Sequence, residues 1–237
     1  MLGGKFFYYD GNEFDTEGDY NKVLGDKIAY DFTNRVNWMG GYLQGEYSTG
    51  SFSAYGTAGY SVIKYNYTNH FRKAEGSNDE LTAETDGIGG YQVKGGASYN
   101  ITEALSAFVN LGYVSKVPIF DAVINDRNGT VAEDPENEKF TSIEGGLNFR
   151  STDNGFWVNA NYYYTQWRDR TLSLGIVNQD GSEGFVFITG MGQDHSGFEI
   201  EGSWRPVNQL SFNFAGSVNN WVYTNNVSGT IKDYEDP

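Results

Sequence analysis

Apolar and polar side chains alternate with a period of two along most of the chain, most clearly over residues 91–114. The apolar positions there are Tyr91, Val93, Ala97 and Tyr99 and, after a polar turn, Leu105, Ala107, Val109, Leu111 and Tyr113. A helix would repeat every 3.6 residues, so this pattern predicts two β-strands joined by a tight turn. Each strand has about ten residues, the length that a tilted strand needs to cross a bilayer.

The same period predicts eight strands along the chain. They cover residues 38–47, 51–67, 91–99, 105–114, 140–150, 156–168, 198–205 and 210–223. Residues 171–177 and 185–189 flank an Asp180-Gly181 pair. Because Asp-Gly is a strong hairpin turn, these two segments are candidates for one more hairpin.

The connections between the predicted strands alternate between short and long. Short turns are expected at residues 48–50, 100–104, 151–155 and 206–209, and long polar stretches at residues 68–90, 115–139 and 169–197. In an up-and-down antiparallel sheet, this order places every short turn on one rim and every long loop on the other. Outer-membrane barrels are built in this way. The sequence therefore predicts an all-β fold, an antiparallel up-and-down transmembrane β-barrel.

The composition agrees with strands in a membrane. Aromatic residues make up 16% of the chain, with 18 Tyr and 16 Phe, and there are 31 Gly. The mean hydropathy is -0.54, and the chain has no run of about 18 apolar residues that would predict a membrane-spanning helix. In a transmembrane barrel only alternate residues touch lipid, so a low mean hydropathy is expected. The tryptophans and tyrosines fit aromatic girdles at the membrane interfaces.

Charge and residue content argue against several functions. The formal charge of -15 disfavours nucleic acid as a partner, because phosphate binding needs clustered cations. The chain has no Cys and only His70 and His195, both in expected loops, which predicts no metal site and no cofactor. Asp194, His195 and Ser196 are sequence neighbours, whereas a catalytic triad assembles from distant segments. We therefore interpret His195 as a loop tip and expect no enzyme activity.

Several motifs in the second half of the chain carry a family resemblance. They are Val-Pro-Ile-Phe at 117–120, Asp-Pro-Glu-Asn-Glu-Lys at 134–139, Ser-Ile-Glu-Gly-Gly-Leu at 142–147, Asn-Tyr-Tyr-Tyr-Thr-Gln-Trp-Arg-Asp-Arg at 161–170 and Gly-Phe-Glu-Ile-Glu-Gly-Ser-Trp-Arg-Pro at 197–206. In order and spacing, this set resembles the β-barrel of TonB-dependent outer-membrane receptors. The resemblance covers roughly residues 90–223, and the earlier part of the chain is compatible with it.

The resemblance implies a function, a location and partners. It implies uptake of a scarce ligand across the bacterial outer membrane with energy from the TonB complex. The expected partners are outer-membrane lipid, the TonB complex through a plug domain, and a small-molecule or oligosaccharide ligand. Ferric siderophores are the commonest ligands of the family, and cobalamin and oligosaccharides are the alternatives.

The chain also departs from the family pattern. Complete receptors carry a plug domain and a barrel of 22 strands, whereas residues 1–237 show no plug, no signal peptide and no closing aromatic strand end. We therefore expect a partial barrel domain, present as an incomplete, open portion. The alternative is a small self-contained outer-membrane barrel with a structural or adhesive role.

Ligand capture in such a receptor is expected to use the long loops. Aromatic side chains supply contact area, and cationic ones orient an anionic ligand. The loop residues of these types that we expect to bind ligand are Phe71, Arg72, Phe120, Arg127 and His195.

Overall fold

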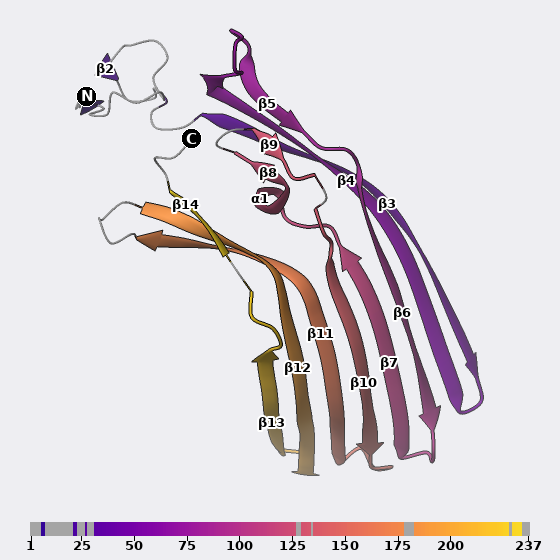
Figure 1. The fold of residues 1–237 in the computed structure, drawn as a ribbon. Helices are drawn as coiled ribbons and strands as arrows, with labels where there is room; N and C mark the ends of the chain where they lie inside the picture. Colours follow the sequence, from indigo (N-terminus) through magenta and orange to yellow (C-terminus); the bar gives the residue numbers. More distant parts are fainter. Residues whose placement is uncertain are drawn as a thin grey trace, which may run out of the picture.

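The chain forms a large antiparallel sheet that curves like part of a barrel wall (Figure 1). The computed structural model describes residues 6–7, 21–22, 27, 31–126, 129–133, 135–177, 183–227 and 229–233. The long strands are β3 (Phe32–Thr49), β4 (Phe52–Lys73), β6 (Ile88–Asn100), β7 (Leu105–Lys116), β10 (Glu138–Arg150), β11 (Phe156–Val177), β12 (Glu183–Val207) and β13 (Leu210–Tyr223). Within the described residues this sheet is open, with β3 and β13 at its two ends.

Shorter elements complete the described structure. The strands β5 (Glu80–Glu84) and β14 (Gly229–Asp233) extend the sheet by pairing with β4 and β12. A four-residue helix, α1 (Phe120–Val123), leads into a small hairpin of β8 (Ile124–Asn125) and β9 (Thr130–Val131). Among the described residues, β1 (Phe6–Phe7) and β2 (Asn21–Lys22) pair only with each other. No helix among the described residues is long and apolar enough to cross a membrane.

The long strands run up and down in sequence order, as the alternation predicts. The order across the sheet is β13-β12-β11-β10-β7-β6-β4-β3, with every neighbouring pair antiparallel. The short turns lie together at the lower rim of the sheet in Figure 1. One of them turns at Gly50, whose φ of 53° suits a residue without a Cβ. The predicted all-β, up-and-down architecture is confirmed.

The strands are longer than predicted at the rim opposite the short turns. Residues 169–197 were expected to be a long connection with a candidate hairpin of residues 171–177 and 185–189. The long connection is wrong, whereas the pairing of the two candidate segments is confirmed. Strands β11 and β12 stay paired up to Val177 and Glu183, while the Asp180-Gly181 turn lies outside the described residues. The register shifts on both sides of Arg170, next to Asp169 with its φ of 57°. Such a bulge shifts the alternation between faces and hides the period of two in the sequence.

The sheet has two distinct faces, which the register defines. Cα partners on neighbouring strands point to the same face, so a row of partners shares one environment. The row Tyr55, Gly96, Asn110, Glu144, Tyr163 and Gly197 is mostly polar. The next row, Ala54, Ala97, Val109, Gly145, Tyr162 and Phe198, is apolar. We call the first face the inner face and the second the outer face.

The outer face carries a band of exposed apolar side chains. Its exposed members include Val93, Val109, Leu111, Ile143, Leu147, Phe149, Tyr162, Phe198 and Ile200. Along β10 this band runs from Phe149 to Thr141, which is roughly 27 Å at about 3.4 Å per residue. A tilted strand needs about 9–11 residues to cross the hydrocarbon core, and this stretch supplies the low end of that number. The outer face therefore has the size and polarity of a lipid-facing surface.

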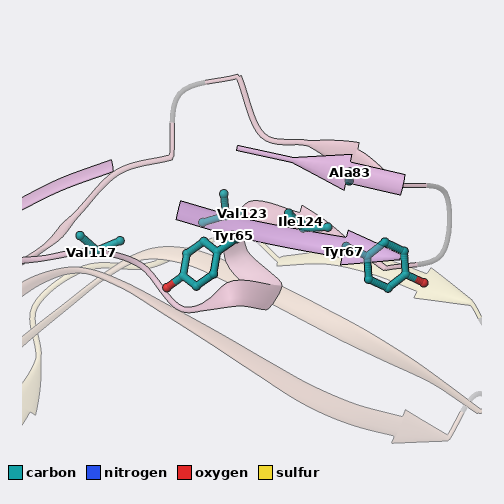
Figure 2. Packing of buried hydrophobic residues seen from close by; sticks show 6 residues of the cluster. All are labelled: Tyr65, Tyr67, Ala83, Val117, Val123 and Ile124. Atoms are coloured by element: carbon teal, nitrogen blue, oxygen red, sulfur yellow. The ribbon is translucent and has the colours of Figure 1, made fainter. Parts of the chain in front are cut away.

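The buried core of the described chain lies near α1, β8 and β9, opposite the short turns (Figure 1), and Figure 2 shows its side chains. We call residues 117–126 and 129–133, which contain α1, β8 and β9, the lobe. Its side chains pack on the inner face of β4 and β5. The core consists of Tyr65, Tyr67, Ala83, Val117, Val123 and Ile124. The Tyr65 hydroxyl donates a hydrogen bond of 2.9 Å to the Pro118 carbonyl, and the Tyr67 hydroxyl donates one to the Asp126 carbonyl. The lobe is thus fixed inside the curve of the sheet.

Candidate ligand-binding groove on the inner face

The lower inner face is a hydrogen-bonded polar surface. Asn110 donates to Glu144 at 3.3 Å and accepts a bond of 3.1 Å from the Tyr55 hydroxyl. Asn161 bridges Glu144 and Glu199 at 3.2 and 3.3 Å. These side chains come from strands far apart in sequence and meet because the register places them in neighbouring rows. Their carboxylates give this part of the inner face an acidic, hydrated character.

A groove of about 580 Å³ lies above this polar surface, between the lobe and strands β3, β4 and β6. Its inner-face lining includes Trp38, Gly40, Tyr42, Gly59, Ser61, Tyr65, Gly90, Gln92 and Lys116, together with Val117, Pro118 and Ile119 of the lobe. Aromatic rings therefore flank a floor of glycine and serine, and the lobe closes the upper side. Pockets that bind small molecules commonly combine apolar walls with a few polar groups in this way.

Glycine at the floor lets the lobe approach the sheet closely. A Cβ at position 90 would lie 3.0 Å from the Ser115 carbonyl oxygen and 3.1 Å from Cγ2 of Val117. A Cβ at position 59 would lie 3.3 Å from the Gln92 side chain. Side chains at these two positions would fill the groove and push the start of the lobe away. Gly59 and Gly90 thus help to create the groove.

The aromatic side chains of β3 are open to the groove. Trp38 is 72% exposed and Tyr42 is 77% exposed, so both rings can stack on a ligand. Polar groups sit beside them at Gln92 and Ser61. The arrangement can bind a ligand that has a flat or apolar surface and hydrogen-bonding groups at its edge.

One cation and one buried carboxylate mark the upper end of the groove. Lys116 lies 3.2 Å from Glu138, whose side chain is only 3% exposed. The same carboxylate accepts a bond of 3.1 Å from the Trp167 indole N–H. A buried carboxylate is stabilised when it is paired and hydrogen-bonded in this manner. Glu138 therefore holds the Lys116 ammonium at the groove, at the end of β7 next to the start of the lobe.

The structure brings together part of the predicted ligand-binding set. Phe120 begins α1, and its ring lies 5.6 Å from that of Tyr65, edge on, and 6.3 Å from that of Tyr67. Phe71 and Arg72 end β4 near the same rim, and the backbone N–H groups of both donate to Asn69 Oδ1 at 3.0 Å. Phe120 therefore belongs to the lobe, and Phe71 and Arg72 lie near the end of the strand on which the lobe packs. Arg127 lies outside the described residues.

The position of His195 differs from the one expected from the sequence. It is not a loop tip but an inner-face residue of β12, paired with Thr165 and Trp221. Its ring lies 5.4 Å from the Trp221 ring, and its Nε2 is 3.1 Å from Gln193 Oε1. Four strands separate β12 from β4 in the sheet, so His195 lies apart from the lobe. His70 likewise belongs to a strand, β4, rather than a loop.

Sequence reasoning missed the aromatic side of the groove. In β3 the residues Trp38, Gly40 and Tyr42 alternate with Met39, Gly41 and Leu43. The apolar set identifies the outer face, so the other set must face inward. Two aromatic residues around a glycine on the inward face of a predicted barrel strand were the signal that pointed to this groove.

The comparison with protein families agrees with this geometry. The model of the TonB-dependent receptor-like β-barrel family matches residues 1–237. The chain belongs to this family. Searches of curated proteins and of solved structures gave no match. Members of the family are outer-membrane receptors that transport ligands and are not enzymes. Family membership thus favours transport over the structural or adhesive alternative.

Proposed function

We propose that the chain forms part of the barrel wall of a receptor that takes up a scarce ligand across the outer membrane, with energy delivered through TonB. Membership of the receptor family supports this function. The two-faced sheet supports it further, because one face suits lipid and the other suits an aqueous lumen.

The groove beside the lobe is the single observation that carries the proposed binding step. It offers the exposed rings of Trp38 and Tyr42 together with the polar groups of Gln92 and Lys116. We propose that the ligand rests on these rings. Phe71, Arg72 and Phe120 would contact it from the lobe side. Arg127 remains a proposed contact, and His195 would contact a ligand that reaches further across the lumen.

A ferric siderophore is the ligand that we propose first, because it is the commonest ligand in the family. An oligosaccharide is the second candidate, and cobalamin the third. The oligosaccharide is favoured by the exposed aromatic pair, since sugar rings present apolar faces to aromatic side chains and hydroxyl groups to amides. The carboxylates of Glu144 and Glu199 on the surface below favour a ligand without a strong negative charge.

Binding to the intact receptor tests the proposed groove. We would replace Trp38 and Tyr42 by Ala and titrate the detergent-purified protein with ferric siderophores, cobalamin and neutral oligosaccharides. Loss of two stacking rings should weaken binding of the true ligand by about tenfold or more, because exposed aromatic anchors often contribute 1.4 kcal/mol or more. Trp204→Ala is the control, since Trp204 is an exposed outer-face residue paired with Phe156. Unchanged affinity in the double variant would place the ligand elsewhere.

Uptake by whole cells tests the energy source separately. Dissipating the proton gradient of the inner membrane should abolish accumulation of the ligand and leave its binding to the cell surface intact. Accumulation that continues without the gradient would contradict the TonB-driven step and leave the binding groove unaffected.

A further inference from the structure

The turn that joins β10 to β11 places an asparagine directly before a glycine, Asn154-Gly155. It lies at the lower rim of the sheet in Figure 1, outside the apolar band of the outer face. Asn154 is exposed and has a φ of 56°, a left-handed conformation that asparagine adopts more readily than most residues. No group among the described residues bonds its side-chain carboxamide. The carboxamide of Asn154 is therefore free to rotate toward the Gly155 nitrogen.

The next residue in the chain supplies a nucleophile. A bond between the Gly155 nitrogen and Asn154 Cγ closes a small imide ring, and a reaction within one molecule avoids the entropy cost of bringing two partners together. Most residues would place a Cβ beside the attacking nitrogen, whereas glycine has none. Water, the second reactant, reaches the exposed side chain directly. The turn thus brings together every group that loss of the Asn154 amide requires.

We propose that Asn154 is a site of spontaneous deamidation. The Gly155 nitrogen attacks Asn154 Cγ, the bond between Cγ and Nδ2 breaks, and the proton of the Gly155 nitrogen leaves with Nδ2 as ammonia. Water then opens the imide at either carbonyl and gives aspartate or isoaspartate, in which the main chain continues through the former side chain. The reaction consumes only water and needs no oxidant or reductant. The inference does not depend on the transported ligand.

The backbone bonds of the turn decide what the conversion changes. The Asn154 N–H donates to the Ser151 carbonyl at 2.9 Å, and the Gly155 N–H donates to Asp153 Oδ1 at 2.9 Å. The Gly155 carbonyl accepts a bond of 2.7 Å from the N–H of Arg205, near the end of β12. Isoaspartate adds a methylene to the main chain before Gly155 and displaces this carbonyl. Deamidation should therefore loosen the turn and the end of β12 together.

The new carboxylate also lies beside an existing one. The Ser151 hydroxyl donates a bond of 2.6 Å to Asp153 Oδ1 and, with the Gly155 N–H, lowers the pKa of the Asp153 carboxyl. Asp153 is therefore ionised at neutral pH, and a second negative charge at position 154 is repelled by it.

The chain offers a matched comparison and two useful variants. Asn208 is also an exposed turn asparagine at the lower rim, but it precedes Gln209, which carries a Cβ. Gly155→Ala places a Cβ beside the attacking nitrogen; this atom would lie 3.3 Å from the Asp153 carboxylate, and Gly155 has no positive φ that would exclude alanine. Asn154→Asp carries the new charge without the extra methylene.

Peptide mapping by mass spectrometry of the intact receptor, aged in neutral buffer, provides the measurement. Fragmentation that distinguishes isoaspartate from aspartate identifies the product. We expect Asn154 to convert at least about tenfold faster than Asn208, and Gly155→Ala to slow it by about tenfold, because a Cβ obstructs ring closure and raises its barrel-independent activation barrier. Hydrogen exchange should show loss of protection at the Arg205 N–H in the isoaspartate form, whereas Asn154→Asp should retain most of it.

Three results would overturn the proposal. The first is equal conversion of Asn154 and Asn208 in the wild type, a comparison that needs no variant to fold. The second is an unchanged rate in Gly155→Ala, which would show that the amide is lost without the imide. The third is unchanged protection of the Arg205 N–H in the isoaspartate form, which would show that the turn does not transmit the change to β12. Ligand binding and uptake are measured separately, so a failure here leaves the proposed function intact.

Discussion

The lower sheet exposes the apolar side chains of its outer face, whereas the lobe region buries its apolar side chains. In the lower sheet, Leu147 on the outer face is 50% exposed, and Val109, Phe149 and Tyr162 on the same face are exposed too. In the lobe region, Tyr67 is only 1% exposed and belongs to a packed core. The sheet thus offers its apolar surface to an external medium, whereas the lobe region buries its own.

This difference shows which part of the chain depends on the membrane. A single sheet layer cannot cover its own apolar face, so the outer face gains its burial free energy only from lipid or detergent. The lobe gains its burial free energy from contacts with β4 and β5, which are present in any solvent. We therefore expect changes in the two regions to respond differently to the medium.

The largest effect should come from breaking the core of the lobe. Tyr67→Ala removes a buried ring and the hydroxyl that bonds the Asp126 carbonyl. Truncation of a buried aromatic residue costs about 3–5 kcal/mol, and here that cost falls on docking of the lobe. Hydrogen exchange of residues 117–126 in the intact protein should lose protection in both lipid and detergent. Tyr42→Ala, at an exposed inner-face position, should leave the protection unchanged. If Tyr67→Ala kept it, the core would not hold the lobe.

A smaller effect, confined to the membrane, should come from charging the outer face. Val109 lies in the middle of the apolar band, and Val109→Arg should destabilise the protein in lipid vesicles by about 2–4 kcal/mol. Ser98→Arg is the control, because Ser98 follows Ala97, the cross-strand partner of Val109, and faces inward. Urea unfolding of the intact receptor in vesicles measures the difference. Equal destabilisation by both variants would contradict the assignment of the faces.

The smallest effect should be a pH dependence of lobe docking. Partial burial disfavours the charged form of the Asp121 carboxyl in α1 and raises its pKa above the usual value. The nearby Asp126 carboxylate raises this pKa further by repulsion. A raised pKa in the folded state means that docking is most stable below the ordinary aspartate pKa and loses this contribution as pH rises through the raised value. Hydrogen-exchange protection factors of residues 117–126 should therefore fall as the pH is raised across that range. Asp121→Asn should remove the trend, and a trend that persists would assign it to another group.

The sheet itself was predictable from the sequence because each strand carries its own signal. Residues such as Val109 and Asn110 alternate between two environments, and this alternation gives both the strand and its faces. The order of short and long connections then gives the up-and-down topology. The strand ends above the membrane were not predictable, because the bulge near Asp169 and polar residues on both faces remove the alternation there.

The ligand-binding groove was predictable only in part. Phe120, Phe71 and Arg72 were expected in long loops, whereas the structure places Phe120 in α1 and Phe71 and Arg72 in the last residues of β4. His195 was wrongly predicted to lie in a loop, because Asp194, His195 and Ser196 are all polar. In the structure these three residues alternate between the two faces of β12. Trp38 and Tyr42 were overlooked, although their position on the inward face of β3 was already implied by the sequence.

The sequence by itself determined the fold class, the family and the two faces of the sheet, because these depend on local alternation and on the order of turns. Only the tertiary structure decided that residues 117–126 fold back onto Tyr65 and Tyr67, and that this contact creates the inner groove. It also decided that the Arg205 N–H bonds the Gly155 carbonyl, which joins the turn after β10 to the end of β12. Such contacts join residues far apart in sequence, and their free energy depends on shape and register, which no local pattern records.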